Sequence, residues 1–185
     1  MQRHPQILRR EHAALLVVDV QQKIAAVMRH KEHVVENIVK LIKACSILNV
    51  PILVSEQYPQ GLGSTITEIA EALGDKIPLQ KMTFSCCHSN ELMQQLKALT
   101  SQQVIVTGIE SHVCVLQTAL DLIANNFQVQ VPRDAVSSRK KMDYKTALER
   151  LSHAGAVITS VEAVLFELLE KAGTPEFKEV TKLIK

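Results

Sequence analysis

A run of aliphatic residues from Ala13 to Val18 ends abruptly at Asp19, and this run is the strongest single constraint on the fold. A continuous apolar run of strand length is typical of a β-strand that is covered on both faces, as in a parallel sheet. The run is too short to cross a membrane or to form the core of a signal peptide. Residues 13–19 therefore predict a strand that is covered on both faces and has a carboxylate at its end.

The rest of the chain alternates strand-length apolar runs with segments of helical periodicity. Further strands are predicted at residues 52–54, 77–79, 104–107, 127–131 and 155–158. Helices are predicted at residues 33–48, 65–73, 91–99, 113–125, 143–153 and 161–171. This alternation favours a three-layer α/β sandwich, in which helices cover both faces of a parallel sheet. No linker or internal repeat interrupts it, so residues 1–185 are predicted to form a single domain.

Composition and charge exclude several classes of function. The formal net charge is +2, with acids and bases interspersed, which predicts neither a nucleic-acid nor a membrane partner. The cysteines lack both the spacing of zinc ligands and the pattern of a disulfide framework; they are Cys45, Cys86, Cys87 and Cys114. We therefore expect a cytoplasmic protein with no metal and no other cofactor.

Three residues with catalytic chemistry fall at the ends of predicted strands. Asp19 closes the first strand, Lys81 follows the third, and Cys114 comes shortly after the strand at 104–107. In open parallel sheets, ligands bind beyond the carboxyl ends of the strands, so these side chains are expected at one edge. Taken singly, each residue has an ordinary alternative role. Asp19 could be an acceptor for loop N–H groups, Lys81 a solvated lysine and Cys114 a small buried thiol.

Cys114 is the candidate nucleophile among these three residues. Ser111 is predicted to cap the following helix, which would place Cys114 in the first helical turn. The helix dipole and the free N–H groups of that turn favour a thiolate and offer donors to an oxyanion. We expect Asp19 to accept the thiol proton during attack and the ammonium of Lys81 to stabilise the resulting charges.

Three motifs resemble the isochorismatase-like cysteine hydrolases. They are residues 18–21 (VDVQ), 81–85 (KMTFS) and 108–115 (GIESHVCV). The resemblance implies an Asp19–Lys81–Cys114 triad and a sheet of six parallel strands in the order 3-2-1-4-5-6. It also implies a non-proline cis peptide at Ile109–Glu110, with the backbone N–H groups of Glu110 and Cys114 forming the oxyanion hole.

Other segments are similar to the isochorismatase domain-containing subgroup, namely residues 55–63 (SEQYPQGLG) and 175–179 (PEFKE). Nicotinamidases of the family carry an Asp-x-His metal motif where this chain has Glu56, Gln57 and Tyr58, so neither a metal nor nicotinamide is expected. True isochorismatases lack the nucleophilic cysteine and cleave a vinyl ether. The presence of Cys114 therefore favours amide or related acyl chemistry.

Further side chains are candidates to line the substrate pocket: Gln21, Glu56, Tyr58, Phe84 and His112. A Cys114–His112 catalytic pair is not expected, because side chains two residues apart on a helix lie on different faces. The basic run at 139–141 is more typical of a solvated loop than of an anion site.

The leading prediction is a homo-oligomeric hydrolase that acts on a small-molecule substrate. It would cleave a C–N (amide-type) or related acyl bond through a thioester on Cys114. The alternative from another class is a catalytically idle oligomeric scaffold or interaction protein with the same fold. A thiol redox role for Cys114, or for Cys86 with Cys87, ranks last because adjacent cysteines rarely form an unstrained disulfide.

Overall fold

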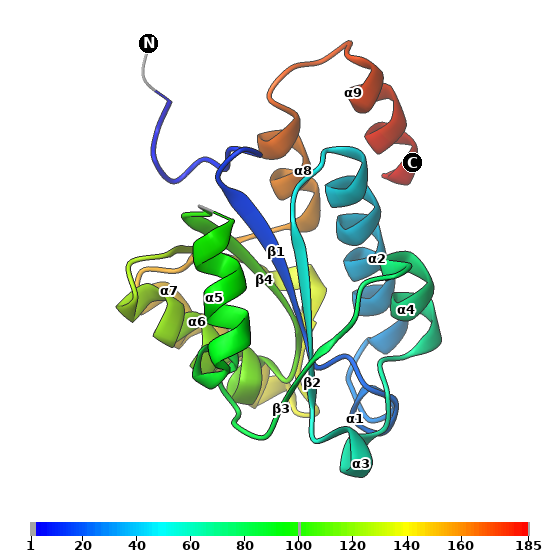
Figure 1. Ribbon diagram of the computed structural model, residues 1–185, viewed down its shortest axis with the longest axis vertical. Helices are drawn as coiled ribbons and strands as arrows, with labels where there is room; N and C mark the ends of the chain where they lie inside the picture. Colours follow the sequence, from blue (N-terminus) through cyan, green and yellow to red (C-terminus); the bar gives the residue numbers. More distant parts are fainter. Residues whose placement is uncertain (1–2, 100, 185) are drawn as a thin grey trace.

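A seven-stranded parallel sheet runs through the centre of the computed structural model (Figure 1). The structure describes residues 3–99 and 101–184. The strands are β1 (Ala13–Val18), β2 (Ile52–Gln57), β3 (Leu79–Lys81), β4 (Gln103–Ile109), β5 (Gln128–Pro132), β6 (Val136–Ser137) and β7 (Val157–Thr159). Their order is β3-β2-β1-β4-β5-β7, and β6 pairs with the end of β4.

This topology confirms the predicted parallel α/β sheet and its strand order, with β7 as the sixth strand of the predicted series. The short strand β6 is a seventh that the sequence patterns missed. A strand of two residues is too short to show any periodicity. Strand β3 lies two residues later than predicted, so Lys81 is its last residue rather than a residue that follows it.

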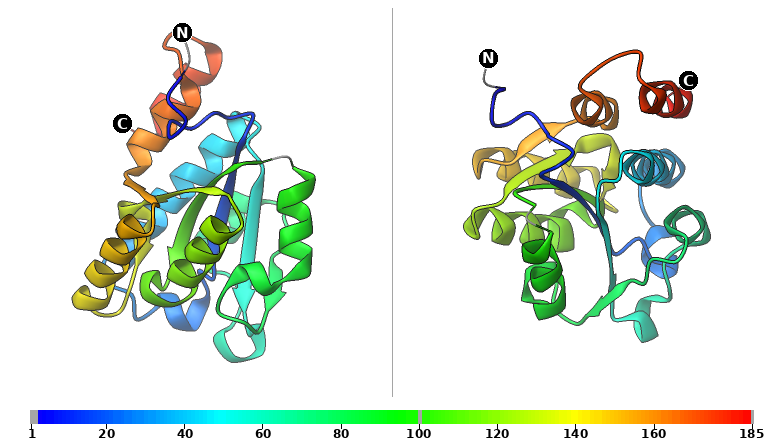
Figure 2. Two further views of the ribbon diagram at one scale, coloured as in Figure 1. Left: turned by 90° about the vertical axis from the view of Figure 1, so that its left-hand side faces the viewer. Right: turned by 45° about the horizontal axis from the view of Figure 1, so that its top comes forward.

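Helices cover both faces of the sheet, as the two views in Figure 2 show. One face carries α2 and α8 together with α4 and α9, and the other carries α5, α6 and α7 (Figure 1). The helices are α1 (Gln22–Ala25), α2 (Lys31–Ile47), α3 (Pro59–Leu62), α4 (Thr67–Leu73), α5 (Asn90–Ala98), α6 (Leu116–Ala124), α7 (Lys141–His153), α8 (Val161–Leu169) and α9 (Pro175–Val180). Within the described residues, no helix combines the length and the apolarity needed to span a bilayer.

The side chains of β1 supply both hydrophobic cores. Leu15 and Val17 pack into the core beneath α2 and α8, whereas Leu16 and Val18 pack into the core beneath α5 and α6. Successive side chains of a strand point to opposite faces, which accounts for this alternation. Every residue of β1 is buried, so the prediction of a strand covered on both faces is confirmed.

The carboxyl ends of β1, β2 and β4 meet at one edge of the sheet. Val18 is in register with Ser55 of β2 and with Gly108 of β4. Gly108 has φ +111°, and a Cβ at this position would overlap the backbone carbonyl of Val18. Only glycine therefore allows the two strand ends to approach this closely. Asp19 leaves β1 with φ 51°, a left-handed conformation that aspartate tolerates better than most residues.

Candidate active site

The buried ion pair of Asp19 and Lys81 is the centre of the site. Lys81 Nζ lies 2.6 Å from Asp19 Oδ2, and the two side chains are 2% and 1% exposed. The same ammonium donates to Gln57 Oε1 at 2.8 Å and to the carbonyl oxygens of Phe84 and Thr83 at 3.1 and 3.2 Å. A lysine ammonium has three protons, and these acceptors replace the water that it loses on burial.

Strand β2 supplies two further groups that the sequence analysis did not single out. Ser55 Oγ donates to Asp19 Oδ1 at 2.7 Å, while Gln57 accepts from Lys81 as described above. Ser55 and Gln57 are two residues apart, so they project from the same face of the strand. Polar residues at alternate positions near the end of a buried strand are the signal that would have identified them.

Cys114 lies in a π-helical turn (Ser111–Val115) that precedes α6, and it is 5% exposed. The predicted cap by Ser111 is wrong. Glu110 occupies the N-cap position without a side-chain cap bond, and Ser111 Oγ is buried with no hydrogen-bond partner among the described residues. Capping patterns assume α-helical spacing, and the wider π turn moves the start of the helix relative to the serine.

The backbone just before Cys114 has the form that the family resemblance implied. The peptide bond between Ile109 and Glu110 is cis. The N–H groups of Val113 and Val115 donate to the carbonyl oxygen of Glu110 at 3.1 and 3.3 Å, which closes a turn around that carbonyl. The Glu110 carboxylate accepts from Arg139 Nε at 3.1 Å and from the Arg139 backbone N–H at 3.0 Å. These bonds fix the Glu110–Cys114 segment.

The thiol of Cys114 differs from the expected thiolate. Burial raises the pKa of Cys114 above its ordinary value, and the negative charge of Asp19 together with its hydrogen bond to the thiol raises this pKa further. The positive charge of Lys81 lowers the pKa but does not reverse the shift. The prediction of a lowered pKa was wrong because it considered the favourable effects of the helix start and of Lys81 but not the burial of the thiol, which is the largest effect. Cys114 is therefore a neutral thiol at rest, with the carboxylate of Asp19 beside it.

Cys86 lies in the same buried cluster. Its Sγ is 3.4 Å from Ser55 Oγ, and its backbone N–H donates to Thr118 Oγ1 at 2.9 Å. Burial and the charge of Asp19 raise the pKa of Cys86, so this thiol is also neutral. Ser55 thus stands between the carboxylate of Asp19 and a second thiol.

The polar atoms of Gln21 and Glu56 contact neighbouring segments rather than the ion pair. The side-chain amide of Gln21 donates to the carbonyl oxygens of Gln57 and Gly63 at 3.0 and 2.7 Å and accepts from the Gln57 N–H at 2.7 Å. Glu56 Oε1 accepts from the Thr65 N–H at 2.6 Å and from Thr65 Oγ1 at 2.7 Å. These contacts tie the ends of β1 and β2 to the segment before α4.

Tyr58 and Phe84 are exposed at the rim of the site, at 45% and 54%. The Tyr58 N–H donates to the carbonyl oxygen of Lys81 at 2.9 Å, and the carbonyl oxygen of Phe84 accepts from Lys81 Nζ. His112 turns toward other partners: its Nδ1 is 3.0 Å from Ser138 Oγ and its Nε2 is 3.8 Å from Asp143 Oδ2.

Potential metal ligands are not grouped in the described part of the chain. No set of three or more His, Cys, Asp or Glu side chains within residues 3–99 and 101–184 is arranged to hold a metal ion. The carboxylate of Asp19 has the ammonium of Lys81 as its cationic partner. The carboxylate of Glu56 is held by Thr65.

Known proteins share this sequence and fold over most of the chain. Residues 13–163 match the isochorismatase domain. The chain is 40% identical over 174 residues to isochorismatase domain-containing protein 2 of Danio rerio, covering 93% of this chain and 86% of that protein. It is 41% identical over 182 residues to the secreted isochorismatase effector Isc1 of Phytophthora sojae, covering 94% and 84%.

Solved structures agree with this relationship. The structure of MAR1 ribonuclease from Caenorhabditis elegans superposes with a TM-score of 0.91 at 40% identity, covering 96% of this chain and 91% of that one. A cysteine hydrolase from Pseudomonas syringae has the same fold, with a TM-score of 0.81 at 19% identity, covering 89% and 95%. On the evidence of the matched domain and these relatives, the chain belongs to the isochorismatase family and has the hydrolase fold of that family.

Proposed function

We propose that this protein is a small-molecule hydrolase that cleaves a C–N (amide-type) or related acyl bond through a thioester on Cys114. The observation that carries the proposal is the position of Asp19, whose carboxylate is close enough to act on the Cys114 thiol and pairs with Lys81 Nζ at 2.6 Å. A nucleophile, a base and a cation in contact are the parts that covalent acyl transfer requires.

In the proposed first step, Cys114 Sγ attacks the substrate carbonyl carbon while Asp19 takes the thiol proton. Transferring a proton from a free thiol to a free carboxylate is uphill by about 6 kcal/mol, from reference pKa values near 8.5 and 3.9. Forming the S–C bond in the same step removes the need for a free thiolate. The negative charge then moves to the former carbonyl oxygen, which would accept hydrogen bonds from the N–H groups of Glu110 and Cys114.

The tetrahedral intermediate then collapses to a thioester. The C–N bond breaks, and protonated Asp19 gives its proton to the leaving nitrogen. In the second half of the reaction, Asp19 removes a proton from water as the water oxygen attacks the thioester carbonyl. The S–C bond breaks, Cys114 Sγ takes back the proton held by Asp19, and the acid product leaves. Lys81 stays charged throughout and balances the carboxylate whenever Asp19 is ionised.

The reaction is proposed to be independent of metal and cofactor. Lys81 is the cation that neutralises Asp19 and it also donates to Gln57, and the segment Glu56–Tyr58 lacks the histidine of the nicotinamidase metal motif. Tyr58 and Phe84 are proposed to contact the substrate, since both rings are exposed beside the Lys81 loop. We propose that Gln21, Glu56 and His112 support the pocket indirectly, through hydrogen bonds that hold the backbone segments around it in place.

We also propose a homo-oligomer in the cytoplasm. Large apolar side chains are exposed in the single chain, including Val27 at 57% and, beside Lys81, Met82 at 70% and Phe84 at 54%. A second copy that covers them would remove apolar surface from water. The four cysteines are free thiols, as is usual in a reducing compartment. Light scattering at micromolar concentration and cell fractionation test these two statements separately.

The proposal is tested by a turnover screen over small amides, ureides and enol ethers. Single-stranded RNA belongs in the same panel, because the C. elegans relative is described as a ribonuclease. The expected result is hydrolysis of an amide-type substrate that survives exhaustive chelation and disappears in Cys114→Ala. Turnover that persists in Cys114→Ala, or that requires added zinc, would contradict the proposal. A wild-type protein that is inactive on the whole panel would favour the scaffold alternative.

A further inference from the structure

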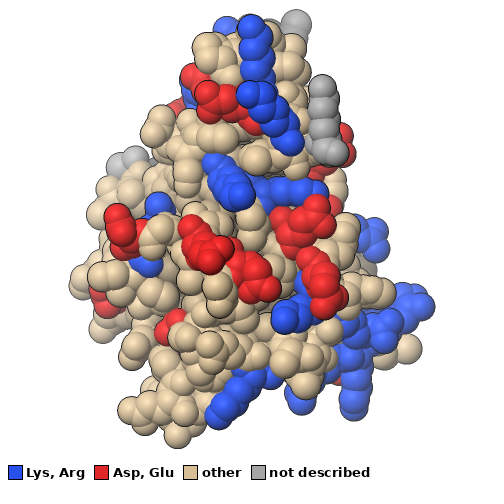
Figure 3. Space-filling view, turned by 90° about the vertical axis from the view of Figure 1, so that its right-hand side faces the viewer, with Lys and Arg blue, Asp and Glu red and all other residues tan. Residues whose placement is uncertain are grey.

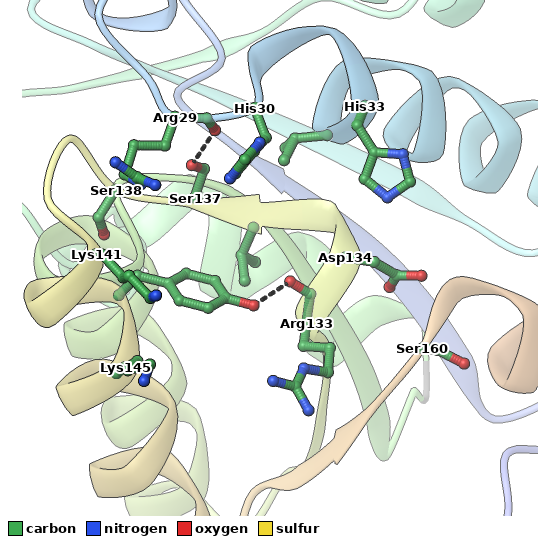
Figure 4. A pocket seen from close by; sticks show the side chains of 13 residues that line it. Arg29, His30, His33, Arg133, Asp134, Ser137, Ser138, Lys141, Lys145 and Ser160 are labelled. Carbon is green, nitrogen blue, oxygen red and sulfur yellow. Dashed lines mark hydrogen bonds between the residues drawn. The ribbon is translucent and has the colours of Figure 1, made fainter.

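A cavity separate from Cys114 opens at the same edge of the sheet (Figure 4). Its volume is about 540 Å³, within the range of pockets that hold small molecules. The walls come from the segment before α2, the start of α2, the β5–β6 connection and the first turns of α7. Asp19, Lys81 and Cys114 are not among the lining residues, so the triad does not account for this cavity.

Cationic side chains surround the cavity. Arg29 and Lys141 lie on one side of it, with Lys145 and Arg133 below them in Figure 4. Among the residues that the structure describes, none of these four forms an ion pair with a carboxylate. Figure 3 shows the wider setting: basic side chains gather at the lower right, at the end of the molecule to which the strands run.

The one acidic side chain of the lining is directed away from these cations. Asp134 Oδ1 accepts from the Val161 N–H at 2.9 Å, at the start of α8. In Figure 4 its carboxylate lies on the far side of the cavity from Lys141 and Lys145. The positive charge of the cavity therefore remains available to a ligand.

The backbone adds a further attraction for an anion. Lys141 is the first residue of α7, a helix of 13 residues whose N-cap makes no side-chain hydrogen bond. The first N–H groups of such a helix, with the dipole behind them, favour a negatively charged group. The walls also hold apolar surface: Val34 and Val136 are buried, and Tyr144 is half-buried with its hydroxyl donating to the Arg133 carbonyl oxygen at 2.7 Å.

We infer that this cavity is a binding site for a phosphate monoester that carries a flat ring, of the size of a nucleoside monophosphate. The cations and the start of α7 would hold the phosphate, and the apolar wall would hold the ring. Lys141 begins α7, so the solvated-loop prediction for residues 139–141 is wrong at this residue. The inference does not rest on the proposed hydrolase, because it uses none of the triad residues.

The cavity wall is continuous with the backbone that carries Cys114. Strand β6 contributes Ser137 to the cavity and pairs with β4 at Gly108 and Ile109. The next residue, Ser138, also lines the cavity and is 3.0 Å from His112 Nδ1. A ligand in the cavity would thus contact the segment that packs against the Glu110–Cys114 turn.

Titration calorimetry with adenosine 5′-monophosphate tests the inference. Wild-type protein should bind the nucleotide saturably at low ionic strength, and Lys141→Glu/Lys145→Glu should weaken binding by about tenfold or more. The matched control is Lys43→Glu/Lys97→Glu, which changes two exposed lysines outside the cavity by the same charge. This control and Cys114→Ala should bind as the wild type does, whether or not the protein turns over any amide.

Further ligands separate the two parts of the site. Adenosine and inorganic phosphate should each bind at least about tenfold more weakly than the nucleotide, because each lacks one of the two groups. Circular dichroism establishes that the variants are folded, and Lys141→Gln/Lys145→Gln replaces the charge reversal if it unfolds the chain. The inference is overturned if the wild type binds no nucleotide, if both double variants lose binding equally, or if adenosine or phosphate binds as well as the nucleotide.

Discussion

The ammonium of Lys81 lies 2.6 Å from the carboxylate of Asp19, and both side chains are almost completely withdrawn from water. If one of the two charges is removed, the other is left buried with neither water nor a counter-ion to stabilise it. The pair therefore links the stability of the sheet edge to the chemistry proposed for Cys114, because Asp19 is also the partner of the thiol. Substitutions here should affect folding and activity in ways that can be measured separately.

Replacing Lys81 by Met should lower the free energy of unfolding by about 3–5 kcal/mol, because it leaves the Asp19 carboxylate buried without a cation. Urea denaturation at neutral pH measures the change. The control is Lys97→Met, an exposed lysine on α5, for which a change within about 0.5 kcal/mol is expected. A loss at Lys81 no greater than that of the control would show that the pair does not stabilise the fold.

Ser55→Ala should impair any acyl-transfer activity by lowering kcat more than it changes KM. The hydroxyl holds Asp19 Oδ1 at 2.7 Å, and without it the carboxylate is free to turn from Cys114. The expected cost in stability is about 1.5–3 kcal/mol, as for a hydrogen bond to a charged group. Ser55→Thr keeps the hydroxyl and should restore kcat. Equal activity in Ser55→Ala and the wild type would remove the positioning role.

The sequence patterns were sufficient to predict the parallel sheet because the strand signals were strong, whereas the strand order was predicted from the family resemblance. The run from Ala13 to Val18 is apolar on both faces, and the helical segments between strands are long enough to show their period. Strands β3 and β6 are three and two residues long, so their limits depend on pairing with β2 and β4 rather than on local pattern. Tertiary contacts decided these elements.

The site was predictable in part, for a related reason. Asp19, Lys81 and Cys114 come together because strand ends converge, which the order of elements already implies. The state of the Cys114 thiol depends on how deeply it is buried, and the exact turn around Ser111 depends on a π-helical geometry. Neither the burial of the thiol nor the π-helical turn can be predicted from the spacing of residues. The predictions of a lowered pKa for Cys114 and of a cap by Ser111 were therefore wrong.

The contribution of the Cys45 thiol to the free energy of unfolding should decrease as the pH rises above 9. Burial raises the pKa of Cys45 from 9.0 to about 12, so the folded state keeps the thiol proton that the unfolded chain loses above pH 9. The stabilisation is complete below pH 9 and is lost between pH 9 and 12, by about 1.4 kcal/mol per pH unit. The difference in unfolding free energy between wild type and Cys45→Ala should shrink over this range. A difference that stays constant from pH 8 to 11 would contradict the burial argument.

Alkylation by iodoacetamide should show that Cys114 is a neutral thiol at rest. In a protein with Cys45, Cys86 and Cys87 replaced by Ala, the rate should keep rising beyond pH 9, because the raised pKa leaves little thiolate at neutral pH. Asp19→Asn should move this rise to lower pH by removing the negative charge that opposes ionisation. If the alkylation rate levels off below pH 8 in the protein that keeps Asp19, Cys114 is already a thiolate at neutral pH, which contradicts this prediction.

Acylation of Cys114 can be measured directly with 4-nitrophenyl acetate as an activated acyl donor. We expect a rapid burst of nitrophenolate equal to the amount of protein, and mass spectrometry should place the acetyl group on the peptide that contains Cys114. Asp19→Asn should slow the burst by at least about a hundredfold, as expected for loss of a general base. Cys86→Ala should keep the burst, whereas Cys114→Ala should abolish it. A burst that survives in Cys114→Ala, or an acetyl group found on Cys86 or Lys81 instead, would contradict the assignment of Cys114 as the nucleophile.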